Sequence, residues 1–185
     1  NRTRCGEEIG RGRNKGITCM IVIKKSRLAG EIKIQPSKSA AHRAVICGAL
    51  TGDNCKISNI ALSDDIKATL GAVKDLGLCN YEIIGDSCFI KPAKPEKKQE
   101  IFCNESGSTL RFCIPLGMDG KKHVFTGKGR LLQRPQQPYE EICREKGIFW
   151  KQTESGIEIC GNLQSGAYKI RGDISSQFIS GLLFV

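Results

Sequence analysis

Short runs of alternating apolar and polar residues are followed, along this chain, by longer runs with helical spacing. Ile32 and Ile34 predict the end of a strand. A helix over residues 40–50 follows, and either Ser37 or Ser39 can cap its start. The first predicted pair of elements is therefore a strand that leads directly into a helix.

The same order of predicted elements recurs. A shift of 68 residues aligns Ser39 with Gly107 and Gly107 with Ser175, and each position lies between a strand-like run and an apolar helical run. In the first two copies a second helix follows, at 65–76 and 137–146. The other strands of these copies are expected at 55–60, 81–84 and 88–91, and at 123–127, 149–153 and 156–159. The sequence therefore predicts an α/β (α+β) fold of repeated β-α-β-α-β-β units.

These repeats divide the chain into two full units, at about 30–92 and 99–161, and the start of a third at about 166–185. Residues 1–19 are rich in Arg and Gly and lack hydrophobic periodicity, so we expect a disordered basic extension before a truncated domain over 20–185. A repeat unit buries its apolar face against neighbouring copies. An incomplete third unit therefore predicts an exposed apolar patch near the end of the chain.

The composition is that of a globular domain, since 39% of the 185 residues are hydrophobic and one sizeable core can form. No apolar run is long enough for a membrane span and no secretory signal is recognisable, so we expect a cytoplasmic protein. Ten cysteines without a Cys-x-x-Cys pair predict reduced thiols, and Cys47, Cys55, Cys113 and Cys160 are expected to act as small apolar side chains. With only two histidines, a zinc site is not expected. We also expect no cofactor.

The formal charge of +10 makes a basic nucleic-acid-binding module one alternative, from a different functional class. The charge is dispersed, however. Residues 1–19 carry a net +3, from five Lys and Arg against Glu7 and Glu8, and a further part of the excess lies in the linker Lys94–Lys98. No strand motif rich in aromatic residues, of the kind that stacks on bases, accompanies it.

The start of the first predicted helix combines two cations with two hydroxyls. Lys38 falls in the first turn, where the helix dipole disfavours a cation unless an anion binds there, and Arg43 lies on the same face as Ser39. Taken alone, this pattern fits a solvated basic turn equally well. Because equivalent ends of stacked units face the same way, the helix starts at Ser39, Gly107 and Ser175 are expected on one side of the domain, as a shared positive rim.

Four motifs in this order resemble the 5-enolpyruvylshikimate-3-phosphate synthase family, the 3-phosphoshikimate 1-carboxyvinyltransferases: Pro36 to Ala44, Ser106 to Arg111, Arg130 to Pro135, and Gly172 to Phe178. The resemblance covers about residues 20–185. It implies transfer of the enolpyruvyl group from phosphoenolpyruvate to the 5-hydroxyl of shikimate 3-phosphate, with release of phosphate. It also implies an inside-out barrel of two domains with the active site in the cleft between them.

The resemblance assigns roles residue by residue. The residues implied to bind shikimate 3-phosphate are Lys38, Ser39, Arg43, Ser175, Ser176 and Gln177. The residues implied to bind phosphoenolpyruvate are Lys38, Gly107, Arg130 and Gln177. We expect structural roles for His42, Arg111 and Arg134. The acid and base groups are expected beyond Val185, so the chain should hold half a cleft and be inactive alone, and the full-length protein is expected to be a monomer.

A sibling enzyme, the UDP-N-acetylglucosamine enolpyruvyltransferase, is the alternative within the same fold. It has Lys-Asn where this chain has Lys38-Ser39, and it uses a reactive loop cysteine. The Ser175-Ser176-Gln177 motif also favours the shikimate enzyme over its sibling.

Overall fold

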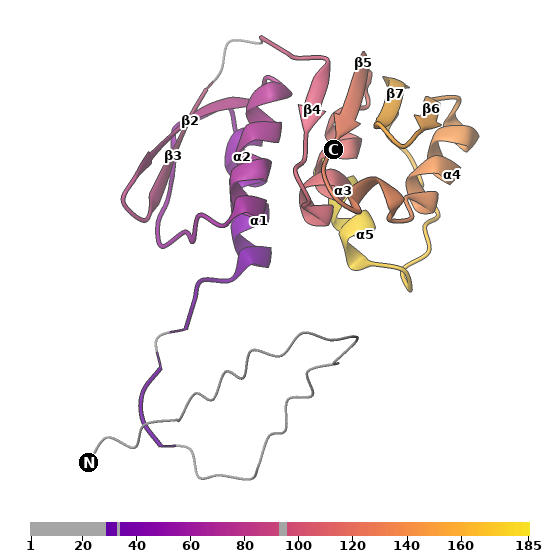
Figure 1. Cartoon of the computed structure of the whole chain (residues 1–185). Helices are drawn as coiled ribbons and strands as arrows, with labels where there is room; N and C mark the ends of the chain where they lie inside the picture. The colour runs from indigo at the N-terminus through magenta and orange to yellow at the C-terminus, as the bar shows by residue number, and fades with distance from the viewer. Residues whose placement is uncertain (1–28, 33, 93–95) are drawn as a thin grey trace, which may run out of the picture. The chain divides into compact units, whose positions relative to one another are not determined.

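The computed structural model describes residues 29–32, 34–92 and 96–185, and the expected extension over 1–19 lies outside this range. All the helices and strands described below belong to one compact unit, Ile34–Val185 (Figure 1). They form two successive segments of similar order, followed by one short helix.

The first segment, residues 38–92, runs helix, strand, helix and hairpin. Its elements are α1 (Lys38–Leu50), β1 (Cys55–Ile57), α2 (Asp64–Asp75), β2 (Cys79–Ile84) and β3 (Ser87–Pro92). The strands form an antiparallel sheet in the order β1-β3-β2, and both helices pack against it. Ile46, Ile66, Leu70 and Ile90 are fully buried between these layers, which makes this half of the core aliphatic.

The second segment, residues 100–162, repeats this order and adds a leading strand. Its elements are β4 (Glu100–Phe102), α3 (Gly107–Leu116), β5 (Asp119–Thr126), the short 3-10 helix η1 (Leu131–Gln133), α4 (Gln137–Lys146), β6 (Phe149–Gln152) and β7 (Ile157–Asn162). The sheet order is β4-β5-β7-β6, in which β4 runs parallel to β5 and the other pairs are antiparallel. Helix α5 (Ser176–Leu182) then packs on α3.

Three evenly spaced serines cap the helices that begin α1, α3 and α5. The Ser37 hydroxyl accepts from the Ala40 N–H at 3.3 Å, and the Ser106 hydroxyl accepts from the N–H of Thr109, also three residues on, at 3.2 Å. The Ser175 hydroxyl accepts from the N–H of Gln177, two residues on, at 3.2 Å. Of the two candidate caps, Ser37 is therefore the one used. The first helix begins two residues earlier than predicted, which places Ser39 inside its first turn.

The strand predicted at Ile32 and Ile34 is wrong. The described residues before α1 form no strand, and the two side chains are 87% and 81% exposed. The run at 167–170, before α5, forms none either. A run of alternating apolar and polar residues forms a strand only where another strand pairs with it, as β5 pairs with β4. Within the described residues these two runs have no such partner.

The cysteines meet the expectation only in part. Cys113 is fully buried and burial raises its pKa to about 12, so it acts as an apolar side chain. Cys47 and Cys160 are exposed, because they lie on the outward faces of α1 and β7, one residue beyond the buried Ile46 and Ile159. All eight cysteines that the structure describes are free.

The apolar patch expected near the end of the chain is present. Large apolar side chains are exposed at Ile174, Ile179, Leu183 and Val185. Ile179, Leu183 and Val185 line a cavity of about 550 Å³ together with Leu163 and other residues. None of the helices in the described part of the chain has both the length and the apolar character of a membrane span.

Candidate functional site

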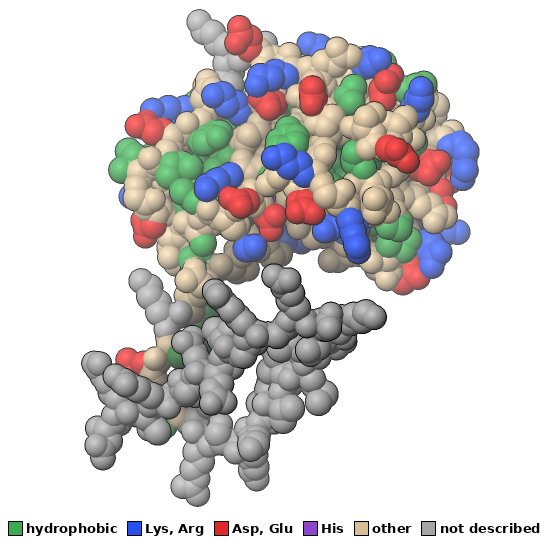
Figure 2. Space-filling view, in the orientation of Figure 1, with side chains coloured by type: hydrophobic (Ala, Val, Ile, Leu, Met, Phe, Trp, Pro, Cys, Tyr) green, Lys and Arg blue, Asp and Glu red, His purple; other side chains and the backbone are tan. Residues whose placement is uncertain are grey.

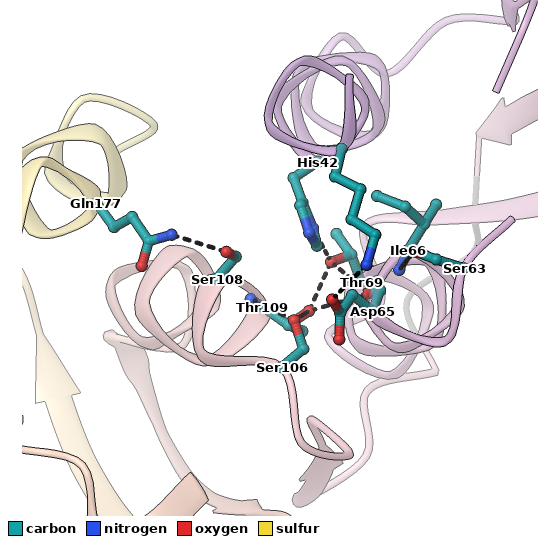
Figure 3. A network of polar contacts seen from close by, with 10 residues as sticks. His42, Ser63, Asp65, Ile66, Thr69, Ser106, Ser108, Thr109 and Gln177 are labelled. Carbon is teal, nitrogen blue, oxygen red and sulfur yellow. Dashed lines mark hydrogen bonds and ion pairs between the residues drawn. The ribbon is translucent and has the colours of Figure 1, made fainter. Parts of the chain in front are cut away.

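The first turns of α1, α2, α3 and α5 gather in one place (Figure 3). Lys38 at the start of α1 forms an ion pair with Asp65 at the start of α2, with 3.2 Å between Nζ and Oδ2. Gln177 in the first turn of α5 donates from Nε2 to the Ser108 hydroxyl in the first turn of α3 at 2.7 Å. Thr69 of α2 also contacts Thr109 in the first turn of α3, at 2.7 Å between the hydroxyl oxygens. Together these contacts confirm the prediction that the helix starts share one side of the domain, although the rim is of mixed charge because Asp65 and Glu105 lie in it.

Helix α1 contributes a preformed arginine. The Arg43 Nη1 donates to the Ser39 hydroxyl at 2.5 Å and to the Ser39 carbonyl at 3.0 Å, and Nη2 donates to the Ser180 hydroxyl of α5 at 3.0 Å. The guanidinium carbon lies 5.1 Å from the centre of the Phe112 ring. Arg43 is half-buried and oriented before any ligand arrives, whereas Lys38 and Ser39 are exposed.

Helix α3 contributes backbone instead of side chains. Gly107 is buried directly after the cap Ser106, and the first turn of α3 carries no acidic residue. A side chain at Gly107 would place its Cβ 2.5 Å from Nη1 of Arg134, so this guanidinium lies over the start of the helix. The free N–H groups of the first turn and the nearby cation make this end of α3 electropositive.

Helix α5 contributes a glutamine held at both ends. Besides its bond to Ser108, Gln177 accepts through Oε1 from Nη1 of Arg111 at 3.0 Å. The Ser175 hydroxyl caps α5, and Ser176 is its exposed first residue. The Arg111 guanidinium lies over the Phe178 ring, with its carbon 4.9 Å from the ring centre. Arg111 therefore joins α3 to α5.

A polar cavity of about 490 Å³ lies where α3 and α5 meet. Its walls are formed by Asp65, Glu105, Ser106, Gly107, Ser108, Arg111, Arg134 and Gln177. Burial and, after it, the Arg134 guanidinium lower the pKa of Arg111. The charged lining of this cavity thus consists of two guanidinium groups, Arg111 and Arg134, and two carboxylates, Asp65 and Glu105, beside the N-terminus of α3.

Of the predicted site residues, Gly107 and Gln177 line this cavity. Lys38 lines a neighbouring one with Asp65 and Glu105, and Arg43 is bonded to Ser39 and to Ser180 of α5. Arg130 is exposed at the start of η1 and does not line this cavity, although Arg134, four residues on, does. Sequence reasoning gave Arg134 only a structural role. Pro135 was the available sequence signal that the chain leaves η1 at Arg134, because a residue before proline favours extended backbone. Arg134 has this conformation, with φ −71° and ψ 134°.

Residues 22–185 match the family model described as EPSP synthase (3-phosphoshikimate 1-carboxyvinyltransferase). The chain belongs to this family. Family membership agrees with the resemblance carried by the four motifs, and it favours the shikimate enzyme over its UDP-N-acetylglucosamine sibling.

Two relatives illustrate the relationship to the family. A 3-phosphoshikimate 1-carboxyvinyltransferase of Clostridium kluyveri is 45% identical over 170 residues, which cover 89% of this chain and 39% of the relative. One of Clostridium botulinum is 48% identical over 172 residues, which cover 85% of this chain and 39% of the relative. The chain thus spans about two fifths of the length of these EPSP synthases.

Solved structures of the family share the fold. Two structures of EPSP synthase from Acinetobacter baumannii superpose with TM-scores of 0.65 and 0.69, at 22% and 24% identity. Each comparison covers 84% of this chain, and 37% or 38% of the solved chain. The mixed α/β architecture of residues 34–185 is therefore that of a part of an EPSP synthase.

The charge of the EPSP synthase domain gives no support to the nucleic-acid alternative. Lys97 and Lys98 of the basic linker form ion pairs with Asp119 and Asp75, with N–O distances of 2.5 Å and 2.7 Å. Figure 2 shows basic and acidic side chains intermixed over the face in view, without a continuous basic stripe. Part of the positive charge is thus neutralised within the fold.

Proposed function

We propose that this chain supplies one half of the active site of an enzyme that transfers the enolpyruvyl group from phosphoenolpyruvate to the 5-hydroxyl of shikimate 3-phosphate. The observation that carries the proposal is the convergence of the first turns of α1, α3 and α5. The Gln177–Ser108 hydrogen bond links α5 to α3, and the Arg43–Ser180 hydrogen bond links α1 to α5. Both substrates are anions, and this convergence offers helix N–H groups, hydroxyls and three cations within one region.

Shikimate 3-phosphate is assigned to the side formed by α1 and α5. We propose that Lys38, Ser39 and Arg43 bind it from α1, and that Ser175, Ser176 and Gln177 bind it from α5. The Ser180 bond that joins the Arg43 guanidinium to α5 supports this, because a single ligand can then touch both helices. The planar fork of Arg43 matches the oxygens of a phosphate or carboxylate.

Phosphoenolpyruvate is assigned to the start of α3. We propose that the Gly107 N–H binds it closely, with Lys38 and Gln177 shared between the two substrates. We keep for Arg130 the role in phosphoenolpyruvate binding that the family motif implies, although it lies on an exposed loop. We add Arg134 to the residues that bind phosphoenolpyruvate, because its guanidinium lies over Gly107. A glycine is needed here because a side chain would fill the space between the helix start and the ligand.

The chemistry requires more than this chain provides. The 5-oxygen of shikimate 3-phosphate forms a bond to the enolpyruvyl carbon and phosphate leaves, so protons must move on and off the reacting atoms. We assign that role to no residue among those described, and propose that the acid and base come from the part of the enzyme that the relatives have and this chain does not span.

The repeat organisation is also a proposal. We infer that the two segments are successive copies of one unit and that α5 begins a third, with residues 1–19 as an extension outside them. The even spacing of Ser37, Ser106 and Ser175 supports this interpretation. A cytoplasmic location and a monomeric full-length enzyme complete the proposal.

A graft tests the proposed function. Residues 22–185 replace the matching segment of the Clostridium kluyveri relative, and phosphate release is followed with both substrates. We expect steady turnover by the graft, loss of turnover in the same graft carrying Lys38→Met, and no turnover by the 185-residue chain alone. A folded but inactive graft would refute the assignment, and turnover by the isolated chain would refute the half-site.

A further inference from the structure

A run of buried polar side chains crosses three helices beneath the site (Figure 3). Nδ1 of His42 in α1 lies 2.7 Å from the Thr69 hydroxyl in α2, and that hydroxyl lies 2.7 Å from the Thr109 hydroxyl in α3. Thr109 in turn donates to the Ser106 hydroxyl at 2.8 Å. The four side chains are no more than 3% exposed, so water takes little part in these contacts.

The hydrogen bonds of this run can all be satisfied at once. Each hydroxyl carries one proton, and the direction from His42 Nδ1–H through Thr69 and Thr109 to Ser106 uses each proton once. The Asp65 carbonyl, 3.3 Å from both threonine hydroxyls, offers a second acceptor. A fully connected buried network of this kind is rigid, because each bond depends on the geometry of the next.

Stability alone does not account for this arrangement. Around the run, the helices pack through apolar side chains, among them Phe112, which meets the His42 ring edge-on at 6.2 Å between ring centres. Replacing both partners of a buried hydrogen bond by apolar groups of the same shape is close to neutral. Apolar contacts, however, have little directional preference, whereas hydrogen bonds fix one register between the helices.

Each end of the run lies beside a proposed ligand residue. His42 precedes Arg43 and stands one turn after Lys38, while Ser106 precedes Gly107. In the middle, Asp65 offers its carbonyl to the threonines and its carboxylate to Lys38. The network therefore joins the two helix starts that must meet one pair of substrates.

We propose that Thr69 and Thr109 are positioning residues that hold the first turn of α1 at a fixed spacing and register from the first turn of α3. The ligands are those of the proposed function, on which this inference rests for their identity. Neither threonine touches substrate in this proposal. Their hydroxyls act through Lys38 on one side and the Gly107 N–H on the other.

The test uses the 185-residue chain with three substitutions. Thr109→Val removes the hydroxyl at nearly constant shape, Thr109→Ser restores it, and Thr51→Val removes a hydroxyl at the far end of α1, where Thr51 donates to the Gly48 carbonyl at 2.9 Å. Two readouts are taken by NMR below the unfolding transition. One is hydrogen exchange of the Ala41 amide, which bonds to the Ser37 carbonyl at 3.0 Å, and the other is the affinity for shikimate 3-phosphate.

Thr109→Val should speed Ala41 exchange and weaken shikimate 3-phosphate binding, each by roughly tenfold, the effect of one lost hydrogen bond. Thr109→Ser and Thr51→Val should both stay within about twofold of the parent. Ala41 lies on a different helix from the substitution, so a purely local effect would not reach it.

The outcomes test the positioning role of the threonines separately from the proposed substrate half-site. Unchanged exchange in Thr109→Val overturns the positioning role, whatever the ligand does. Faster exchange with unchanged affinity also overturns it, because the network is then structural only. If the parent chain does not bind shikimate 3-phosphate at all, the proposed half-site is wrong for the isolated chain, and the exchange comparison still decides whether the network sets the register. If Thr109→Val does not fold, Thr69→Val is measured in its place.

Discussion

The two segments begin with the same serine cap and then use their first helical turn in opposite ways. After Ser37, α1 presents the exposed side chains of Lys38 and Ser39. After Ser106, α3 presents the buried Gly107 and leaves its backbone N–H groups to act. In the proposed site, the start of α1 would therefore bind a ligand through side chains, and the start of α3 would bind one through backbone N–H groups. A repeated local structure can supply two different binding chemistries by changing one residue after the cap.

The segments also differ in what their first helix packs on. In the first, α1 lies on the hairpin of its own segment, where a Cβ at Gly48 would meet the terminal methyl of Ile90 at 2.9 Å. In the second, α3 lies against α5, where a Cβ at Gly181 would meet the backbone oxygen of Arg111 at 2.6 Å. A side-chain tip can move aside, but a backbone oxygen within a helix cannot do so without disturbing that helix.

The largest effect is therefore expected from Gly181→Ala. Overpacking against backbone should destabilise the docking of α5 by about 3 kcal/mol. Gly48→Ala is the matched change in the first segment, and it should cost less than about 1 kcal/mol, because alanine also favours the helix. Urea unfolding of both variants gives the comparison. Equal midpoints would show that the α3–α5 contact is no tighter than that of α1.

The first segment shows why some of the fold was predictable and some was not. The helix at 65–76 was placed within one residue, because its apolar residues repeat on one face. The strand at Ile32 and Ile34 was not correct, since a strand depends on a partner that local alternation does not reveal.

The candidate site was predictable in the same uneven way. The cap and cation pattern around Lys38 is local in sequence, so it was visible there. Arg134 was missed because its contact with Gly107 depends on how the loop folds back over α3. The Thr69–Thr109 contact was missed because it joins two helices whose packing no motif specifies.

The next largest effect concerns the arginine of each segment, and is measured in the active graft. Arg43→Lys and Arg130→Lys keep the charge but remove the planar fork. Each substitution should lower the affinity for one substrate by roughly tenfold to a hundredfold, which is the effect of a lost charge-assisted hydrogen bond. Arg43→Lys should weaken the binding of shikimate 3-phosphate added by itself. Arg130→Lys should weaken the binding of phosphoenolpyruvate to the complex with shikimate 3-phosphate. Equal loss of shikimate 3-phosphate affinity in both would refute separate roles.

A smaller effect is expected from pH through His42. Burial lowers the pKa of His42 below its ordinary value of 6.5; the Asp65 carboxylate opposes this, and Lys38 and Arg43 reinforce it. Below that value the unfolded chain binds more protons than the native one, so the free energy of unfolding should fall as pH is lowered through 6.5. Urea unfolding between about pH 7.5 and pH 5 measures this slope. The slope should flatten in His42→Asn and persist in His123→Asn. A slope that flattens only in His123→Asn would assign the pH dependence to the second segment.

The smallest effect is expected at the ion pair that links the two helix starts of the first segment. Lys38 and Asp65 are 58% and 39% exposed, so solvent screens their attraction and the pair contributes less than about 1 kcal/mol to stability. The same carboxylate opposes any anion that approaches Lys38. Asp65→Asn should therefore leave the urea midpoint nearly unchanged and raise the affinity of the chain for shikimate 3-phosphate by roughly threefold. Asp64→Asn removes a charge from the same turn, but its carboxylate is 83% exposed and pairs with Lys67 instead, so it should raise the affinity less. Weaker binding in Asp65→Asn alone would mean that Asp65 holds Lys38 in place for the ligand, as Ser39 and Ser180 hold Arg43.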